Sequence, residues 1–345
     1  MATIKEVAAL ARVSTATVSH VLNQTTYVSP KLRERVVKVV HQLNYHPNNL
    51  ARSLRTKRSK TVAMIIPDIT NPFFPAVVRG AEDTLLREGY TLIVGNSDYE
   101  VQKEERYFRT FCEKRVDGLL LVINPIRTPD YLVRHNIQET AVVYINRLYH
   151  GVAGDAVLTD NVGGSREAVR HLLEQGHRRI GIITGPLNLL MARRRLRGYE
   201  RALKERGLPV EAELIAQGRY DLKSGFEQAK VLMSLPSRPT AVFVSNGLMT
   251  LGCLRAVFEV GLRCPEDVAL VGFDDLDLFE IMRPRVSAVA QPDYELGSVA
   301  AQMLLDRITK KTTARYRRKV LKTKLVVRES SSRRLPAADA ANAPS

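Results

Sequence analysis

In the first forty-five residues, apolar positions recur every three or four residues, which is the spacing of helices with one buried face. Thr3 and Glu6 can form a capping box, which predicts a first helix over residues 4–10. Ser14 follows a tight turn and can cap a second helix over residues 15–22. Two short helices joined in this way would share one small core. The residues expected to face that core are Ile4, Val7, Ala8, Leu10, Val18, Val21 and Leu22.

The second of these helices would present a small, polar face without acidic groups to the solvent. Such a face suits a surface that is pressed into the major groove of DNA. A solvated helix face is the more common role of this pattern, but the tight turn, the two caps and the basic surroundings favour DNA binding here. The residues on this face are Thr15, Ala16, Ser19, His20 and Asn23.

A third helix is predicted over about residues 30–43, because Ser29-Pro30 supplies a helix start. The residue before Pro47 avoids the helical region, so the chain breaks at His46-Pro47. Residues 48–55 could form one more helix, too short to be stable alone. A segment that becomes helical only on DNA would couple DNA binding to the rest of the chain. The third helix would pack on the first two through Leu32, Val36, Val39, Val40 and Leu43.

From Thr61 onward, short apolar runs alternate with helical stretches, which is typical of buried parallel strands joined by helices. Two successive series of such strands predict two doubly wound α/β lobes in tandem. Helices of the second series are expected over residues 193–206, 224–235 and 248–260. The apolar runs cover residues 61–68, 90–96, 116–123, 141–146, 178–186, 212–218, 240–246 and 268–275.

Polar and aromatic residues gather where these strands end, which is where doubly wound sheets bind ligands. Aromatic faces can cover a sugar or base ring, while carboxylate, amide and guanidinium groups can pair with hydroxyl groups. A turn or loop cap is the more frequent role of any one such residue, but their shared position at strand ends favours a binding site. The candidates are Asp68, Asn71, Phe73, Phe74, Asn146, Arg147, Asp160, Asn246, Asp274, Asp275 and Gln291.

The length of 345 residues and the hydrophobic content of 45% suffice for more than one globular domain. Charge is unevenly distributed: residues 1–60 carry a net charge of +9, residues 61–306 of −3 and residues 307–334 of +11. A basic head on a nearly neutral body favours a polyanionic partner for the head. The second basic run, KKTTARYRRKVLKTK, fits either a solvated loop and strand or an auxiliary contact with DNA or another anionic partner.

Several classes of protein are not expected. No run of about eighteen apolar residues occurs and the chain starts with a capped helix, so we expect a cytoplasmic protein without membrane insertion. Cys112, Cys253 and Cys264 show neither metal-ligand spacing nor a disulfide framework. Motifs of nucleotide-binding enzymes, serine hydrolases and zinc proteases are absent, which argues against an enzyme. The Asp274-Asp275-x-Asp277 run lacks a matching His or Glu, so neither a metal nor a cofactor is predicted.

The segments ATIKEVAALARVSTATVSHVLN and RSLRTKRSKTVAMIIPD resemble the bacterial lactose-repressor and galactose-repressor (LacI/GalR) family, with a head similar to that of the purine repressor. The resemblance extends over nearly the whole chain. It implies that the second helix reads the major groove, while the paired hinge helices of a homodimer enter the minor groove. Leu54 would be the wedge between base steps, with Arg55 beside it, and Ala51 would lie where the hinge helices touch. The implied DNA-contacting residues are Ser14, Thr15, Ala16, Thr17, His20, Asn23, Ala51, Leu54 and Arg55.

One position of the head departs from the family. Arg12 stands in the turn where the family often has Gly or Asn. A left-handed backbone at an arginine costs roughly 1 kcal/mol. The exact turn geometry therefore depends on this residue, whereas the two-helix motif does not.

The same resemblance implies a body similar to periplasmic sugar-binding proteins. Arg195, in RRRLRGYERAL, matches the family pattern R-x-x-G-[FY], although a surface charge on a helix is the plainer interpretation. Asn146 stands where sugar-binding members commonly have Asp, and Leu189 and Met191 replace polar positions that contact the purine in the purine repressor. These departures favour a sugar or sugar derivative as effector, with a purine corepressor or a protein coeffector as alternatives. The implied pocket residues are Phe73, Phe74, Asn146, Arg147, Arg195, Tyr220, Asn246, Asp274 and Gln291.

The sequence thus predicts a DNA-binding transcriptional regulator that binds a pseudo-palindromic operator as a homodimer and responds to a small effector between its lobes. It would be a repressor where the operator overlaps a promoter. A nonspecific architectural DNA protein would not need a two-lobe body. The tail lacks apolar heptads, so we expect a dimer rather than a tetramer. The expected boundaries are a helix-turn-helix head over 1–46, a hinge helix and linker over 47–60, a two-lobe domain over 61–332 and a disordered tail over 333–345.

Overall fold

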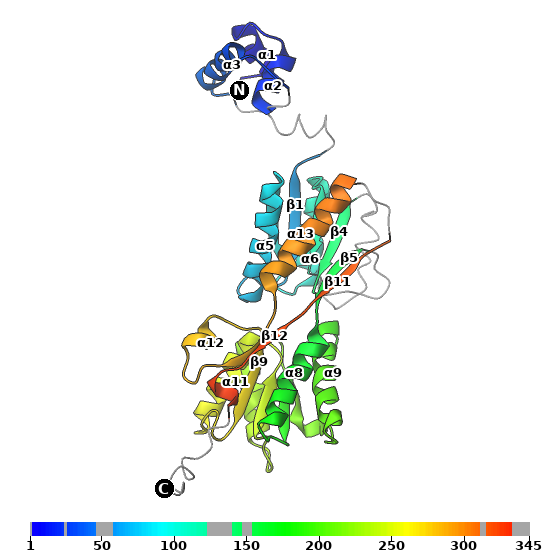
Figure 1. Ribbon diagram of the computed structural model, residues 1–345, viewed down its shortest axis with the longest axis vertical. Coiled ribbons are helices and arrows are strands. Elements are labelled where there is room, and N and C mark those ends of the chain that lie inside the picture. Colours follow the sequence, from blue (N-terminus) through cyan, green and yellow to red (C-terminus); the bar gives the residue numbers. More distant parts are fainter. Residues whose placement is uncertain are drawn as a thin grey trace, which may run out of the picture. The chain divides into compact units, whose positions relative to one another are not determined.

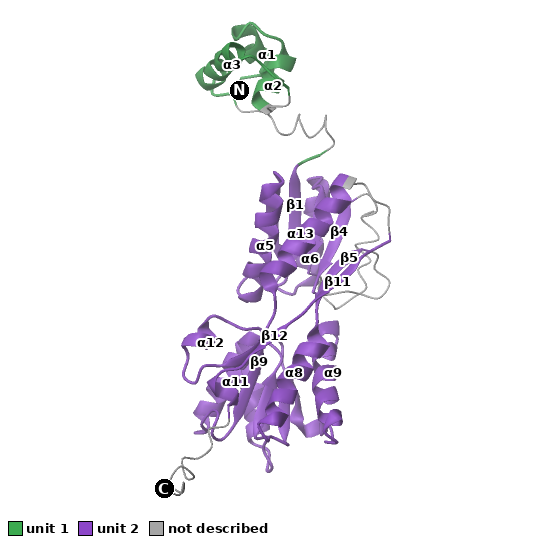
Figure 2. Cartoon of the chain, viewed as in Figure 1, with its two compact units in different colours: residues 1–59 green, residues 60–345 purple. Residues whose placement is uncertain are grey.

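The computed structural model divides into two compact units, residues 1–59 and 60–345, which Figure 2 colours separately. The finer division into head, hinge, body and tail stays a prediction. The helix predicted over 48–55 and the tail over 333–345 both lie outside the described residues. The residues that the structure describes are 2–23, 26–45, 58–122, 140–146, 154–310 and 315–332.

The described residues of the first unit form three helices, α1 (Ile4–Leu10), α2 (Thr15–Asn23) and α3 (Pro30–Gln42). The predicted capping box is present, because the Glu6 backbone amide donates to Thr3 Oγ1 (3.3 Å) and the Thr3 amide donates to Glu6 Oε2 (2.7 Å). Ser14 Oγ caps α2 by accepting from the Thr17 amide at 3.1 Å. All three helices of the predicted head are therefore confirmed.

The core of the first unit is built as the apolar pattern predicts, with one correction. Val7, Val18 and Val36 are fully buried at its centre. Leu10 was expected to face the core but is 56% exposed, because Ala11 completes the buried stripe of α1 in its place. Arg12 has a φ of +48°, so the left-handed residue in the turn is confirmed.

The second unit consists of two lobes, each built on a six-stranded sheet (Figure 1). The sheet of lobe 1 has the order β11-β5-β4-β3-β1-β2, with every pair parallel. Its elements are β1 (Thr61–Ile66), α5 (Phe73–Arg87), β2 (Thr91–Asn96), α6 (Val101–Glu113), β3 (Gly118–Leu121), β4 (Ala141–Ile145), β5 (Asp155–Thr159), α13 (Asp293–Lys310) and β11 (Arg318–Leu321).

The sheet of lobe 2 has the order β12-β10-β9-β8-β6-β7, and only the pair of β12 with β10 is antiparallel. All eight predicted apolar runs contain a strand, which confirms the α/β fold class. The elements of lobe 2 are α8 (Asn161–Glu174), β6 (Ile180–Thr184), α9 (Leu190–Glu205), η2 (Ala212–Leu214), β7 (Ile215–Gln217), α10 (Leu222–Met233), β8 (Ala241–Val244), α11 (Gly247–Glu259), β9 (Ala269–Phe273), α12 (Leu278–Ile281), β10 (Ser287–Ala290), β12 (Lys324–Val326) and η3 (Glu329–Ser331).

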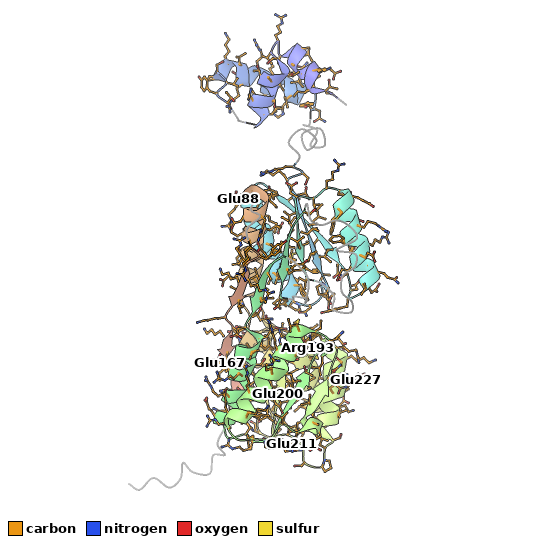
Figure 3. All side chains as sticks on the ribbon, turned by 90° about the vertical axis from the view of Figure 1, so that its right-hand side faces the viewer. Glu88, Glu167, Arg193, Glu200, Glu211 and Glu227 are labelled. Carbon is orange, nitrogen blue, oxygen red and sulfur yellow. The ribbon has the colours of Figure 1, made fainter. Side chains whose placement is uncertain are left out.

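Helices cover both faces of each sheet, so alternate residues of the strands pack in opposite directions. In lobe 1, Val62 and Met64 belong to the cluster under α5 and α13, whereas Ala63 and Ile65 pack with α6. In lobe 2, α10 and α11 cover one face and α8 and α9 the other. Figure 3 shows Arg193 near the end of lobe 2 that faces lobe 1 and Glu211 at the far end.

The two lobes are not simply in tandem along the chain, as the apolar runs suggested. The chain passes between the sheets after β5, after β10 and after β11, so α13 and β11 return to lobe 1 and β12 belongs to lobe 2. β5 and β10 were missed because small or polar residues make up much of each strand. Three connections therefore join the lobes.

The basic segment of residues 307–334 is partly used for ion pairs within the fold. Arg307 and Arg317 both donate to the buried carboxylate of Asp155, and Arg328 makes two hydrogen bonds to Asp275 (2.7 and 2.9 Å). β11 lies in the run with exposed basic side chains, as a solvated strand would. No helix within the described ranges is both long and apolar enough to cross a membrane.

Candidate functional site

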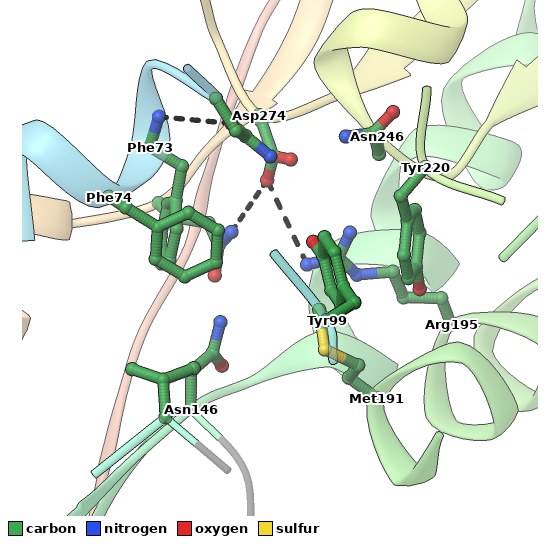
Figure 4. A pocket seen from close by; sticks show the side chains of 12 residues that line it. Phe73, Phe74, Tyr99, Asn146, Met191, Arg195, Tyr220, Asn246 and Asp274 are labelled. Atoms are coloured by element: carbon green, nitrogen blue, oxygen red, sulfur yellow. Dashed lines mark hydrogen bonds and ion pairs between the residues drawn. The ribbon is translucent and has the colours of Figure 1, made fainter. Parts of the chain in front are cut away.

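A narrow pocket lies between the two lobes (Figure 4). The loops after β1, β2, β3 and β4 supply its lobe 1 wall, while α9 and the ends of β8 and β9 supply much of its lobe 2 wall. The carboxyl ends of parallel strands therefore converge on one cleft, as doubly wound sheets favour. The lining residues are Asn71, Phe73, Phe74, Tyr99, Val122, Asn146, Met191, Arg195, Tyr220, Asn246, Asp274 and Gln291.

The structure brings together eight of the nine residues that the family resemblance implied for the pocket, and Arg147 lies outside the described residues. Asn71, a strand-end candidate, also lines it. Three other strand-end candidates have structural roles elsewhere. Asp68 accepts from the Thr70 amide (2.9 Å), Asp160 caps α8, and Asp275 pairs with Arg328. For the candidates that do line the pocket, a role in binding the effector stays a prediction.

Arg195 is the central charged residue of the pocket and is fully buried, which excludes the plainer interpretation of a surface charge. Its Nε donates to Asn161 Oδ1 at 2.7 Å, its Nη1 donates to the Ser245 carbonyl, and its guanidinium carbon lies 3.7 Å from the centre of the Phe273 ring. Nη2 lies 3.8 Å from Asp274 Oδ1 and has no hydrogen bond in the described part of the chain. A buried donor is thus available for a ligand.

Asp274 and Gln291 complete this polar centre. Gln291 Nε2 donates to Asp274 Oδ1 at 2.5 Å, and Figure 4 marks both contacts of Asp274. Oε1 of Gln291 is buried without a hydrogen-bond partner among the described residues. The pocket therefore offers one carboxylate, one guanidinium and an unused amide oxygen, with no net charge. Such a set matches a neutral ligand that carries several hydroxyl groups, each of which can both donate and accept.

Three asparagines reach the pocket with their oxygens already engaged. Asn246 Oδ1 caps α11 through the Met249 amide (2.7 Å), and Asn71 Oδ1 accepts from the Phe73 amide (3.1 Å). Asn146 Oδ1 accepts from Thr159 Oγ1 at 3.1 Å. Because the oxygens hold the local backbone or a neighbouring strand, the amide nitrogens are the groups left for a ligand.

Four lining residues have a left-handed backbone although none is glycine. The φ angles are +61° at Tyr99, +54° at Asn146, +68° at Tyr220 and +70° at Asp274. Each costs on the order of 1 to 2 kcal/mol relative to a relaxed backbone. Strain of this kind clusters at functional sites, where it aims side chains that a relaxed loop would point elsewhere.

Aromatic side chains form much of the remaining wall. The rings of Phe73 and Phe74 meet edge to face, with centroids 5.1 Å apart. The Tyr220 ring packs on Gly185, where a Cβ atom would lie 2.0 Å from Tyr220 Cζ. Glycine is therefore required at position 185 for this ring to take its place.

Tyr99 and Val122 line the pocket although they were not among the predicted pocket residues. Val122 belongs to a predicted strand, so its place at the carboxyl end was the only available signal. Leu189 was expected at a position that contacts the ligand, but it is buried in the core of lobe 2 and does not line the pocket. Met191 does line the pocket. Of the two apolar residues that replace polar positions of the purine repressor, only Met191 therefore bears on the identity of the ligand.

The first unit carries the predicted DNA-contacting residues. Thr15 and Ala16 are exposed at the start of α2, and His20 is half-buried. Ser14 and Thr17 hydrogen-bond each other (2.9 Å) as part of the helix cap. The side chain of Asn23 and residues Ala51, Leu54 and Arg55 lie outside the described residues. α2 has no acidic residue in its first turn, so its positive end is open to an anion.

Metal binding and thiol chemistry have little support among the residues that the structure describes. Those residues contain no group of three or more His, Cys, Asp or Glu side chains that could hold a metal ion. All three cysteines are free, and burial raises the pKa of Cys264 to about 12 and raises that of Cys253 further. Thiols that stay protonated are poor nucleophiles.

The family of this chain can be read from the known proteins that it resembles. Residues 3–48 match the model of "Bacterial regulatory proteins, lacI family", and residues 169–331 match that of a "Periplasmic binding protein-like domain". The ribose operon repressor of Escherichia coli (strain K12) is 37% identical over 317 residues, which cover 92% of this chain and 96% of that repressor. The chain belongs to the lacI family of bacterial regulatory proteins.

Other lacI family members resemble this chain almost as closely. The HTH-type transcriptional repressor PurR of Aliivibrio salmonicida is 34% identical over 90% of this chain and 93% of its own. The solved complex of the transcriptional regulator CelR with cellobiose is 34% identical, with a TM-score of 0.72 over 96% of this chain and 100% of that chain. The solved Lac repressor dimer bound to operator and the anti-inducer ONPF is 26% identical, with a TM-score of 0.83 over 96% of this chain and 99% of that chain. Each of these relatives is named as a repressor or a transcriptional regulator.

Proposed function

We propose that the protein is a transcriptional repressor that binds a pseudo-palindromic operator as a homodimer and changes its operator affinity when a neutral sugar binds between its lobes. The observation that carries the effector part is the electrically balanced polar centre of Arg195, Asp274 and Gln291 in a pocket between the lobes. Homodimerisation is supported by the Lac repressor, whose solved structure is described as a dimer on its operator.

The head supports the DNA-binding part of the proposal. α2 follows a tight turn, is capped by Ser14 and exposes Thr15 and Ala16, as a recognition helix requires. The four basic residues of α3, Lys31, Arg33, Arg35 and Lys38, are exposed and suit contacts with phosphate groups. Ser14, Thr15, Ala16, Thr17, His20, Asn23, Ala51, Leu54 and Arg55 are the proposed contact residues.

Thr15→Asp should abolish operator binding without loss of folding. A carboxylate in the first turn of α2 favours the helix by about 0.3 to 1 kcal/mol but places a negative charge against the DNA. We expect operator affinity to fall at least a hundredfold in an electrophoretic or anisotropy titration, with an unchanged or raised thermal midpoint. The operator is first obtained by selection from random duplexes.

Ala9→Asp is the matched control, because it adds the same charge to an exposed position of α1. It should weaken operator and random DNA equally and by much less. Operator binding by Thr15→Asp at the unmodified level would place α2 outside the groove and end this part of the proposal.

The effector is proposed to be a single-ring neutral sugar of the ribose type. The pocket between the lobes is narrow, with about 20 Å³ of free cavity volume, which favours a small ligand. Its charges cancel, so a sugar phosphate or sugar acid would bring an anionic group without a second cation among the lining residues. The ribose operon repressor is among the relatives with the highest identity reported above.

A thermal-shift screen of the full-length protein tests this assignment. At one hundred times its dissociation constant, a ligand stabilises the folded state by about 2.7 kcal/mol, so the true effector should raise the midpoint clearly. We expect ribose to stabilise the protein more than ribose 5-phosphate, ribonate, cellobiose, guanine or hypoxanthine. Stabilisation by a purine base alone would replace the sugar by a purine corepressor, and the operator titration repeated with ligand gives the sign of regulation.

A further inference from the structure

The loop after β2 holds a tyrosine where the backbone favours glycine. The Glu100 amide donates to the Ser97 carbonyl at 2.8 Å, which closes a four-residue turn. The two central residues, Asp98 and Tyr99, have φ angles of +50° and +61°. A turn with two left-handed central residues strongly prefers Asn-Gly or Gly-Gly, and a bulky residue there is an outlier.

Neighbouring contacts hold this turn in place. Asn96 Nδ2 donates to Asp98 Oδ1 at 2.6 Å, and Asn96 Oδ1 accepts from the Ile69 amide at 2.9 Å. Lys103 of α6 forms an ion pair with Asp98, and the Ser97 amide donates to the Ile66 carbonyl at 2.9 Å. The turn is thus tied to β1, to the loop after β1 and to α6. Tyr99 is displayed on a rigid support rather than on a free loop.

The Tyr99 side chain lines the effector pocket from lobe 1. Figure 4 shows its ring on the side of the pocket that Met191, Arg195 and Tyr220 of lobe 2 form. The ring therefore comes from one lobe and faces the other, and it occupies space that would extend the pocket beyond the polar centre. A strained residue at a ligand site indicates that its side chain has a function there.

We propose that Tyr99 is the wall that sets the size of the effector, an inference that rests on the proposed sugar-binding function. Its ring covers one face of a single sugar ring held by Arg195 and Asp274. A second ring, whether another sugar or a base linked to the first, would need the space that the tyrosine fills. Aromatic faces suit this role, because they contact the apolar C–H face of a sugar while hydroxyl groups reach the polar centre.

Tyr99→Gly tests the wall without endangering the fold, because glycine is the residue that the turn prefers. Full-length protein is titrated with ribose and with cellobiose in a calorimeter. We expect the variant to bind ribose at least tenfold more weakly and cellobiose at least tenfold more tightly, with a thermal midpoint that does not fall. Tyr99→Phe, which keeps the ring, should retain the original preference.

An unchanged ratio of the two affinities in Tyr99→Gly would overturn the proposal. Failure of the sugar assignment can be told apart from failure of the Tyr99 proposal. In that case the unmodified protein binds a purine base instead of ribose. The same comparison, made between that base and its ribonucleoside, decides the role of Tyr99 in that case.

A second measurement needs no known effector. The chain contains no tryptophan, so Tyr99→Trp introduces the sole indole of the protein. If position 99 faces lobe 2 across the pocket, acrylamide should quench this indole at less than half the rate found for free tryptophan. Quenching at the rate of the free amino acid would show a solvated side chain and would overturn the proposal whichever ligand binds.

Discussion

Arg195→Met is expected to reduce effector affinity at least a hundredfold, or about 3 kcal/mol of binding free energy. Methionine keeps the unbranched stem but removes the guanidinium, which is the only cationic group among the lining residues described for the pocket. The change also leaves Asp274 without its cationic neighbour and Asn161 Oδ1 without its donor. Isothermal titration with the ligand identified in the screen measures the loss.

Arg197→Met is the matched control for this prediction. Arg197 lies two residues further along α9 with an exposed side chain, so its removal should leave effector affinity within twofold of the original. Operator binding without effector should persist in both variants, because the head is a separate compact unit. Normal effector affinity in Arg195→Met would remove Arg195 from the binding site and leave it a purely structural residue.

Asp155→Asn is expected to lower the free energy of unfolding by about 3 to 5 kcal/mol, the cost of breaking a buried ion pair from one side. Asp155 is fully buried and receives two hydrogen bonds from Arg307 (3.0 and 2.9 Å) and one from the Arg317 side chain (3.1 Å). The Arg317 amide adds a fourth, at 2.7 Å. An uncharged amide cannot neutralise these arginines, and urea unfolding followed by circular dichroism measures the loss.

The same carboxylate predicts a loss of stability in acid. Burial alone would raise the pKa of Asp155, but hydrogen bonds from Arg307 and Arg317 outweigh burial and hold the pKa below its usual value of 3.8. Because the folded-state pKa is the lower one, the stabilisation is complete well above pH 4 and is lost as the pH falls through the folded-state pKa. Asp306→Asn, which removes only the more exposed partner of Arg317, should cost less than about 1 kcal/mol. Equal losses in the two variants would contradict the central role of Asp155.

Periodicity predicted most of the fold because most elements bury one complete face. The eight long apolar runs all contain strands, and the caps at Thr3 and Ser14 fixed the helix starts of the head. Periodicity could not reveal strands made largely of small or polar residues, such as β5 and β10, or the return of α13 to lobe 1. Long-range pairing of β11 with β5 leaves no local signal, since the two strands are separated by more than 150 residues.

The pocket was predictable to the extent that strand ends converge. Asn146 and Asp274 directly follow strands and Asn246 lies two residues after one, so topology alone places them at the cleft. Arg195 and Tyr220 came from the family resemblance, because nothing in a run of three arginines distinguishes the buried one. Neither the strand-end pattern nor the family resemblance predicted Tyr99, because its position depends on a left-handed turn that the sequence Asp-Tyr does not favour.

The last strands of the chain have a consequence for its synthesis. β11 and β12 form the edges of two different sheets, and both follow α13 near the carboxyl end. A nascent chain therefore cannot complete the sheet of lobe 1 until Leu321, nor that of lobe 2 until Val326, has emerged from the ribosome, although the three-helix head can already fold. A premature stop before Arg318 would leave both sheets one strand short and expose β5 and β10 as new sheet edges.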